Sequence, residues 1–319
     1  NKLKNFINEN QLVKANDRLL LAVSGGKDSV VMTHLLHQLN YTFALAHCNF
    51  KLRGEDSDGD EKFVKELANK LNVPFYSKSF DTKIYAKENK LSIQMAARDL
   101  RYEWFDALCS KEGYQKIATA HHQDDSIETL LIKKSRKASI GALQGILVKN
   151  ANLIRPLLAF NVKQIQNYTS ENSIEYREDK SNLSNKYQRN SIRKTLKFES
   201  QERRVQYLDE IERNKKSYSK LIEKCDRYKN MYCEDKNDGL LLPFKYLLEQ
   251  EEKQEILYEL LKHFGPFSWR DVFSLLESQV GRFVANSEFR IVKERQGLFI
   301  SKISNNLNEH LSINVNDKL

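Results

Sequence analysis

Short apolar runs alternate with helical periodicity along the first half of the chain. Continuous apolar runs predict buried strands near residues 19–23, 41–47, 73–77 and 116–120. Around these runs, apolar residues recur every three to four positions, which predicts helices near residues 2–15, 27–39, 58–71, 92–111 and 125–134. Alternating strands and helices are typical of an α/β fold with a doubly wound, mostly parallel sheet that helices cover on both faces. In such a sheet, ligands bind at the carboxyl ends of the strands.

The pattern changes in the second half of the chain. A helix is predicted near residues 162–172 and a short strand at 174–177. The charged, glycine-free stretch from about 195 to 231 predicts one long helix, whose charges are most simply a solvated face. Two amphipathic helices over 240–279 and short strands at 282–289, 289–292 and 298–301 follow. We therefore expect a catalytic domain at 1–195, a helical connector at 196–235, and a mainly helical second domain with terminal short strands at 236–319.

The first apolar run breaks at paired glycines before a helix restarts. We call residues 24–29 the glycine turn; they read Ser24-Gly25-Gly26-Lys27-Asp28-Ser29. Glycine can take positive φ, so backbone N–H groups can converge on an anion where the dipole of the helix also favours negative charge. The serines add hydroxyl donors, Lys27 adds a cation, and Asp28 adds a carboxylate for Mg²⁺. We predict a phosphate-binding site; the alternative is a turn that merely joins strand to helix.

Polar side chains also follow the strand at 116–120, in the order His121-His122-Gln123-Asp124-Asp125. This stretch belongs to the same sheet edge as the glycine turn, so Asp124 and Asp125 could join Asp28 in holding Mg²⁺ between phosphate oxygens. Adjacent histidines point in different directions and make a poor metal pair. The alternative interpretation is an acidic first turn of a helix.

Two arginines share one face of the helix at 92–111. Arg98 and Arg101 lie three residues apart, opposite an apolar stripe that includes Trp104 and Leu108. Two guanidinium groups on one face suit a triphosphate or an RNA backbone, but arginines on helix surfaces are also commonly solvated. Spacing alone does not decide between these interpretations.

Composition narrows the class of partner. The 319 residues include 52 Lys and Arg against 43 Asp and Glu, a net charge of +9, which favours a polyanion such as nucleic acid. The four cysteines form no C-x-x-C pair, so neither a zinc ribbon nor an iron–sulfur cluster is indicated. No apolar run approaches the roughly 18 residues of a membrane span, and no signal peptide is recognised. We expect a cytoplasmic protein without a membrane partner.

Six motifs, in order over residues 19–194, closely resemble the tRNA(Ile)-lysidine synthetase family. The glycine turn lacks the common G-x-x-x-x-G-K-S/T spacing and is similar instead to the PP-loop of the N-type ATP pyrophosphatases. The other motifs are His47-Cys-Asn-Phe-Lys-Leu-Arg-Gly-Glu-Asp-Ser57, Ala96-Ala-Arg-Asp-Leu-Arg-Tyr102, Ala118-Thr-Ala-His-His-Gln-Asp-Asp125, Ile154-Arg-Pro-Leu-Leu158, and Arg177-Glu-Asp-Lys-Ser-Asn-Leu183 with Arg189-Asn-Ser-Ile-Arg193.

This chain departs from the family pattern in one loop. It reads Arg136-Lys137-Ala138-Ser139 where the family usually shows Arg-Gly-Ser/Thr-Gly, which leaves the role of the loop's glycines, Gly141 and Gly145, open. Longer family members also carry a third, C-terminal domain, and we expect none in this chain.

The resemblance implies a function. Family members join free lysine to C2 of the wobble cytidine in the CAU anticodon of tRNA(Ile), converting ATP to AMP and pyrophosphate through an adenylated cytidine. The resemblance therefore implies ATP and Mg²⁺ as cofactors, with tRNA(Ile) and L-lysine as partners. A homodimer is considered as well.

Roles are assigned to site residues on the same basis. The catalytic set is Lys27, Asp28, Arg98 and Asp125. The ATP-binding set is Ser24, Gly25, Gly26, Lys27, Asp28, Ser29 and His121. Mg²⁺ is expected at Asp28, Asp124 and Asp125. Contacts to tRNA are expected at Arg101 and at Arg189 and Arg193, which lie four residues apart and so would share a helix face.

Other functions stay open from the sequence. Thiolation of tRNA usually requires catalytic cysteines or a C-x-x-C cluster, which are missing here. A non-catalytic RNA-binding protein with a relict nucleotide loop would have no need of an intact Lys27 and Asp28. ATP-dependent amidation of a small metabolite would form AMP without any tRNA.

Overall fold

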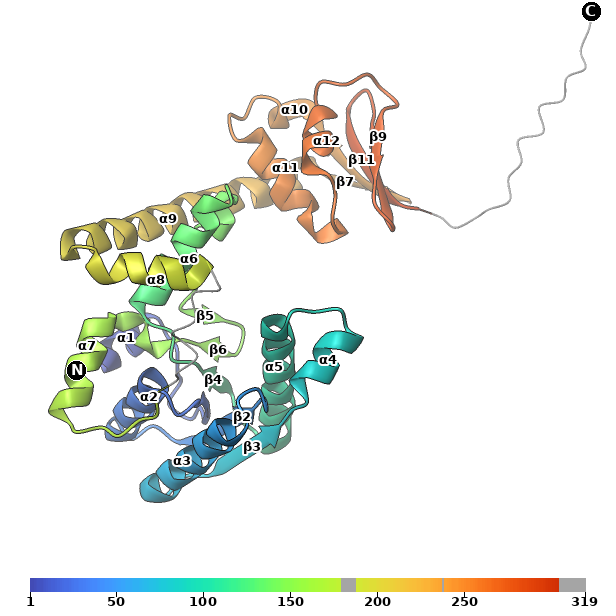
Figure 1. The fold of residues 1–319 in the computed structure, drawn as a ribbon. Coiled ribbons are helices and arrows are strands. Elements are labelled where there is room, and N and C mark those ends of the chain that lie inside the picture. The colour runs from blue at the N-terminus through green and yellow to red at the C-terminus, as the bar shows by residue number, and fades with distance from the viewer. Residues whose placement is uncertain (179–187, 237, 304–319) are drawn as a thin grey trace, which may run out of the picture. The chain divides into compact units, whose positions relative to one another are not determined.

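The computed structural model describes residues 1–178, 188–236 and 238–303, apart from the side chains of residues 188–190 and 197. The chain forms two compact units, Asn1–Asn214 and Lys215–Leu319. Figure 1 labels the helices and strands of both. Within the described ranges, no helix combines the length and the apolarity that crossing a membrane requires.

A sheet of six strands, counted over the described residues, is the centre of the first unit. Its order is β3 (Phe75–Ser79), β2 (Phe43–Asn49), β1 (Leu19–Ala22), β4 (Lys116–Ala118), β6 (Leu153–Ile154) and β5 (Lys149–Asn150). Neighbouring strands pair in parallel, except that β5 runs antiparallel to β6. The predicted mostly parallel α/β sheet is therefore confirmed. Leu21 pairs with Ala118, so the carboxyl ends of β1 and β4 lie side by side.

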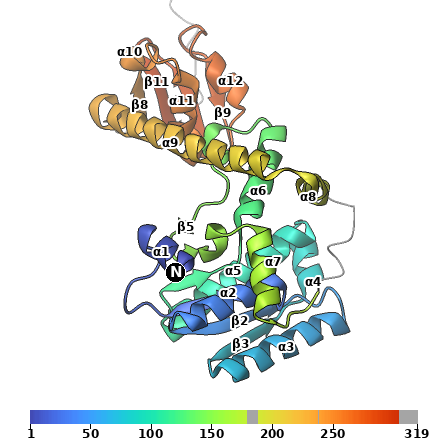
Figure 2. The same cartoon turned by 90° about the vertical axis from the view of Figure 1, so that its left-hand side faces the viewer.

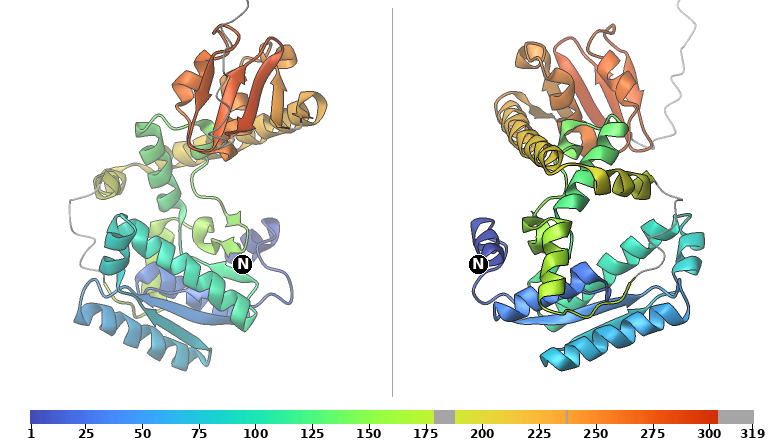
Figure 3. Two further views of the ribbon diagram at one scale, coloured as in Figure 1. Left: turned by 90° about the vertical axis from the view of Figure 1, so that its right-hand side faces the viewer. Right: turned by 60° about the vertical axis from the view of Figure 1, so that its left-hand side comes forward.

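Helices cover both faces of this sheet. In chain order the helices are α1 (Lys2–Glu9), α2 (Lys27–Gln38), α3 (Glu55–Leu71), α4 (Thr82–Glu88), α5 (Ile93–Glu112), α6 (Gln123–Ser135) and α7 (Val162–Glu171), of which α4 packs on α5 and α6 on the later helix of residues 188–198. Leu19 and Leu21 pack with residues of α1, α2, α3 and α7, whereas Leu20 packs with Phe105 of α5 on the other face. Because β1 is buried on both faces, it reads as a continuous apolar run. Figure 2 shows α2 beside α7, and Figure 3 shows α3 and α5 on opposite sides of the sheet.

The charged stretch expected to form one long helix contains two. They are α8 (Gln188–Phe198) and α9 (Gln201–Tyr232). The break falls at Ser200, whose Oγ accepts the N–H of Arg203 at 3.2 Å. Serine is a favoured residue before a helix because its hydroxyl satisfies a free N–H of the first turn. The periodicity alone did not reveal this new start.

The second unit holds an antiparallel sheet as well as helices. In its described part the strand order is β7 (Glu234–Lys236), β8 (Gly239–Pro243), β11 (Gly297–Lys302), β10 (Phe289–Lys293) and β9 (Phe283–Ala285). The helices beside it are α10 (Phe244–Leu247), α11 (Lys253–Leu261) and α12 (Trp269–Ser274). The expectation of a mainly helical domain therefore needs correction. The apolar run in β8 was assigned to a helical stretch because so short a run cannot be told from a buried helix by periodicity.

A buried tyrosine tests the packing of the second unit. Tyr228 of α9 is fully buried, its hydroxyl donates to the carbonyl of Pro243, and its ring stacks on Tyr246. We expect Tyr228→Phe to lower the free energy of unfolding by about 1–2 kcal/mol, because the buried carbonyl loses its donor. A urea titration followed by circular dichroism measures this change. Tyr232→Phe is the control, since Tyr232 stacks on the same Tyr246 ring without a hydroxyl hydrogen bond to described residues. Equal losses in both variants would contradict the prediction.

Candidate active site

The glycine turn connects β1 to α2 at the carboxyl edge of the sheet. Gly25 has φ of +88°, a left-handed conformation that side chains other than glycine rarely adopt. The space around it is ordinary, because a Cβ there would lie 3.5 Å from the Phe63 ring. Backbone conformation, rather than crowding, therefore explains the glycine. Gly26 follows in extended conformation, and α2 begins at Lys27.

The two serine hydroxyls brace the turn from inside. Ser29 Oγ donates to the carbonyl of Gly26 at 2.8 Å and lies 3.3 Å from Ser24 Oγ. The N–H of Gly26 points to Ser24 Oγ at 3.3 Å. Ser29 is buried, whereas Ser24 is exposed. The buried hydroxyl thus holds the turn in shape, and the exposed one can also reach a ligand.

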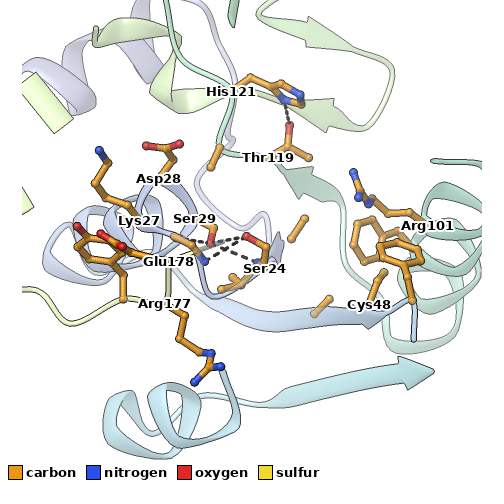
Figure 4. A pocket seen from close by; sticks show the side chains of 18 residues that line it. Ser24, Lys27, Asp28, Ser29, Cys48, Arg101, Thr119, His121, Arg177 and Glu178 are labelled. Carbon is orange, nitrogen blue, oxygen red and sulfur yellow. Dashed lines mark hydrogen bonds between the residues drawn. The ribbon is translucent and has the colours of Figure 1, made fainter. Parts of the chain in front are cut away.

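A cavity of about 760 Å³ opens beside this turn, which is within the range of small-molecule sites. Figure 4 shows Lys27 and Asp28 at one end, with Cys48 and Arg101 at the other. His121 also lines the cavity, and its Nδ1 lies 3.0 Å from Thr119 Oγ1. The ATP-binding residues predicted from the sequence, except Gly25, are thus among the lining residues. The cavity combines the polar turn with an apolar end at Ala46, Cys48, Phe50 and Phe105.

His122 lies at the centre of the carboxylates, a position that the sequence analysis missed. Its Nε2 is 3.7 Å from Asp28 Oδ2 and 3.6 Å from Asp125 Oδ2, and its Nδ1 is 3.8 Å from Asp124 Oδ2. The available signal was the position of His122 directly before the helix that carries both aspartates. The rule that neighbouring histidines point in different directions argues against a metal pair, but it does not exclude a contact of one histidine with the carboxylates.

Asp28 and Asp125 differ in their protonation behaviour. Burial raises the pKa of Asp28, and this effect outweighs the opposing charges of His122 and Lys27. Burial also acts on Asp125, but the charge of His122 and the hydrogen bond from its backbone N–H, at 3.0 Å, hold the pKa of Asp125 below its usual value. The environment therefore favours the ionised form of Asp125 and disfavours that of Asp28.

Asp124 is not brought to the cavity. Its Oδ2 accepts the N–H of Val162 at 2.8 Å, and its Oδ1 accepts Arg204 Nη1. Both carboxylate oxygens are therefore used to join α6 to α7 and α9. The assignment of Asp124 to Mg²⁺ needs correction, because helix geometry turns adjacent side chains in different directions.

Arg193 lies in an ion-pair network instead of on a free helix face. Its Nε donates to Glu128 Oε1 at 2.6 Å and its Nη2 to Asp125 Oδ1 at 3.2 Å. The expectation that Arg193 is available to tRNA phosphate therefore needs correction. Glu128, which is buried and was not singled out from the sequence, neutralises part of its charge. The side chain of Arg189, its proposed companion, lies outside the described residues.

The two arginines of α5, Arg98 and Arg101, differ in whether they reach the cavity. Arg101 lines the cavity, with its guanidinium 5.3 Å from the centre of the Phe50 ring. Arg98 is exposed and lies 4.9 Å from the centre of the Tyr102 ring, and it is not among the cavity-lining residues. The catalytic role expected of Arg98 therefore needs correction, whereas Arg101, assigned above to tRNA, borders the cavity at the end opposite Lys27 and Asp28 (Figure 4).

Three further lining residues come from far along the chain. Tyr176, Arg177 and Glu178 border the cavity where the sequence predicted a short strand. No strand forms there; the N–H of Arg177 donates instead to the carbonyl of Gly25 at 3.0 Å. The motif that begins at Arg177 was noted in the family resemblance but was given no role.

The loop that departs from the family pattern retains one required glycine. Gly145 has φ of +66°, and a Cβ there would lie 2.3 Å from Ser126 Oγ and 3.0 Å from Ile211. That hydroxyl accepts the N–H of Ile146 at 2.9 Å. Gly145 therefore allows the loop to approach α6 closely, whereas Gly141 lies in a short 3₁₀ turn, Ile140–Ala142.

The fit of a divalent cation depends mainly on Asp28. Both oxygens of Asp125 already accept hydrogen bonds, from the N–H of His122 and from Arg193 Nη2, so Asp125 would share an oxygen between these donors and a cation. Asp28 Oδ1 is buried and has no hydrogen-bond partner in the described structure. A buried carboxylate oxygen without a donor suits a cation, and Mg²⁺ commonly binds one or two carboxylates together with phosphate oxygens. Across the described residues, no group of three or more His, Cys, Asp or Glu side chains is arranged to hold a metal alone. The donors present therefore fit a cation that phosphate helps to bind.

The raised pKa of Asp28 predicts a pH-dependent stability difference. The native state disfavours ionised Asp28, so Asp28→Asn should raise the melting temperature at neutral pH. This gain should vanish as the pH falls through the raised pKa towards about 4, the usual value, because the wild-type carboxyl group is then also neutral. Thermal melts of both proteins across this range test the sign. A gain that grows on acidification, or a less stable variant at neutral pH, would show that the assigned direction is wrong.

Comparison with known proteins supports one family. Residues 1–199 match the PP-loop domain, and residues 235–303 match the TilS substrate binding domain. The chain is 34% identical over 310 residues to the tRNA(Ile)-lysidine synthase of Bacteroides thetaiotaomicron, which covers 93% of this chain and 70% of that protein. It is 37% identical over 290 residues to the tRNA(Ile)-lysidine synthase of Chlorobaculum tepidum, covering 86% of this chain and 87% of that protein.

A solved structure agrees on the fold. The U34-tRNA thiolase NcsA from Methanococcus maripaludis superposes with a TM-score of 0.53 over 66% of this chain and 77% of its own, at 17% identity. That likeness extends to architecture alone. The sequence similarity extends further, since it spans both matched domains in the curated relatives. The chain therefore belongs to the tRNA(Ile)-lysidine synthase family.

Proposed function

We propose that this protein ligates lysine to C2 of the wobble cytidine in the CAU anticodon of tRNA(Ile), forming lysidine and converting ATP to AMP and pyrophosphate. The observation that carries the proposal is the cavity beside a PP-loop turn in a chain of this family: Asp28 lines it, and Asp125, which is not a lining residue, lies behind it on the other side of His122 Nε2, 3.6 Å from that atom. ATP use follows from the PP-loop domain, and tRNA(Ile) from the names of the relatives.

The chemistry requires activation of the base. The C2 carbonyl of cytosine is a poor electrophile, so its oxygen first attacks the α-phosphorus of ATP and the bond to the β-phosphate breaks. The lysine amine then attacks C2, loses a proton, and AMP leaves with the former carbonyl oxygen. Negative charge grows on the pyrophosphate during the first step, so donors aimed at that group lower the barrier.

The chain's own residues supply those donors. The left-handed Gly25 leads the backbone into the start of α2, whose first residues line the cavity; the N–H groups of a helix's first turn are available to an anion, and Lys27 adds positive charge there. Asp28 and Asp125 would hold Mg²⁺, which would supply further charge stabilisation on the phosphate oxygens. Arg101 borders the same cavity at the end opposite the glycine turn (Figure 4), where we assign it to the tRNA substrate. The groups at the glycine turn act on charge that develops during adenylation.

RNA binding rests on electrostatics and on the unpaired anticodon. The net charge of +9 attracts a polyanion, and Arg189 is retained as a proposed phosphate contact. A base in an anticodon loop is already unpaired, so it leaves its stack at low cost to reach the cavity. L-lysine as the second substrate and a homodimer are parts of the proposal that solution mass and substrate titrations address.

Thiolation is the closest rival and is disfavoured by one observation. Of the four cysteines, Cys48 lines the cavity, and burial raises its pKa to about 12. A thiolating cysteine needs the opposite shift, because the thiolate is the nucleophile. The cavity therefore lacks an activated cysteine.

The deciding experiment is mass analysis of nucleosides from tRNA incubated with the protein, ATP and lysine. Lysidine at the wobble position, with one AMP formed per modified tRNA, is the expected result. A thiolated nucleoside would favour the rival. AMP formation without tRNA would indicate amidation of a small metabolite, and tRNA binding without AMP would indicate an RNA-binding protein.

Asp28→Asn tests the metal-binding carboxylate within this reaction. We expect AMP formation to fall by at least about 100-fold, because the variant loses a charged ligand for Mg²⁺ at the phosphates. The fold should stay intact, since no core cavity is created. Turnover near the wild-type rate would remove Asp28 from the mechanism.

A further inference from the structure

A buried aspartate of α3 links three segments that are distant in the sequence. Asp60 is only 7% exposed, and each of its carboxylate oxygens accepts from a different arginine. Arg177 Nε donates to Oδ1 at 2.5 Å, and Arg53 Nη2 donates to Oδ2 at 2.6 Å. The loop before α3 and the segment after α7 are thereby fixed to the same helix.

Arg177 extends this link to the glycine turn. Its backbone N–H donates to the carbonyl of Gly25 at 3.0 Å, while its side chain is directed towards α3 (Figure 4). The turn also lies against α3 directly, because a Cβ on Gly25 would be 3.8 Å from the carbonyl oxygen of Asp60. One residue therefore holds the left-handed glycine through its backbone and the supporting helix through its side chain.

Such a link matters most at a glycine. Gly25 has no side chain to restrict it, so its backbone loses more conformational freedom on ordering than any other residue would. A charge-assisted hydrogen bond to buried Asp60 holds Arg177 in place, and Arg177 in turn holds the Gly25 carbonyl. The backbone that follows the Gly25 carbonyl must present its N–H groups to phosphate. The orientation of the Gly25 peptide therefore affects ligand binding directly.

Gly59 leaves the space on α3 that the Arg177 guanidinium occupies. A Cβ at Gly59 would lie 2.8 Å from Arg177 Nη2, closer than real Cβ contacts allow, and 3.1 Å from its Cζ, which is tighter than most. These atoms are the far end of a flexible side chain, so the guanidinium would move and the helix would not. Glycine otherwise weakens the interior of a helix such as α3.

We propose that Asp60 and Arg177 are positioning residues that hold the glycine turn in its phosphate-binding shape, and that Gly59 is present to let the Arg177 guanidinium lie across α3. The proposal rests on the proposed function only in taking ATP as the ligand of the turn. Asp60 does not contact the ligand; it acts through Arg177.

Gly59→Ala tests the proposal without removing any charge. The melting temperature should change little, since the better helix propensity of alanine offsets part of the weakened contact between Arg177 and buried Asp60. It should weaken ATP binding about tenfold, the low end of the cost of losing a supporting contact behind a ligand site. Isothermal titration with ATP and Mg²⁺ measures the affinity. Asn69→Ala is the matched control, because it also improves helix propensity on exposed α3 surface and should leave ATP affinity unchanged.

A double-variant cycle identifies the route of the effect. Arg177→Ala should weaken ATP binding to a similar degree, and Gly59→Ala should add little in its presence, because the displaced side chain is already absent. Additive losses of ATP affinity, or a Gly59→Ala protein that binds ATP like the wild type, would overturn the proposal.

The same measurements separate this proposal from the proposed function. If the ATP affinities change as expected while no lysidine forms, the positioning role stands and the proposed function fails. If lysidine forms and Gly59→Ala leaves the ATP affinity unchanged, the proposed function stands and the positioning role fails.

Discussion

The left-handed backbone at Gly25 is the constraint on which the site depends. It allows a short connection between the end of β1 and the start of α2. The N–H groups in the first turn of α2, which have no partner within the helix, therefore lie at the edge of the sheet. The pairing of Leu21 with Ala118 then places the end of β4, with His121 and His122 behind it, beside the same turn. The groups that must meet a phosphate are thus positioned by two adjacent central strands, and the long segments elsewhere only support them.

Burial of negative charge is the second constraint, and each aspartate meets it differently. Asp124 is compensated fully, by Arg204 and the N–H of Val162, and becomes structural. Asp125 is compensated by the N–H of His122 and by Arg193, so it remains ionised. Asp28 keeps one oxygen without a hydrogen-bond partner among the described residues, and burial raises its pKa. An incompletely satisfied carboxylate is costly in the free protein, and that cost is relieved when a cation and phosphate bind.

The sequence predicts those features that local periodicity and backbone chemistry determine. The parallel sheet, the glycine turn and the proximity of Asp28 to Asp125 follow from short apolar runs and from the rule that strand ends share an edge. The partners of Arg177 and Arg193 could not be predicted, because spacing shows which helix face a residue occupies but not what that face meets. Asp124 was misassigned for the same reason. The sheet of the second unit was missed because its strands are too short for a distinctive period.

The arginines also show why net charge is a limited guide to RNA binding. The net charge of +9 counts every cationic side chain equally. Several of these side chains, however, form ion pairs with buried carboxylates inside the first unit, namely Arg53, Arg177, Arg193 and Arg204. Charges paired in this way have little attraction left for a polyanion, because their field is largely cancelled at short range. Exposed lysines and arginines must therefore supply most of the attraction to tRNA. The paired arginines instead join α3 and α6 to the segments beside the site, which is a different role from attracting RNA.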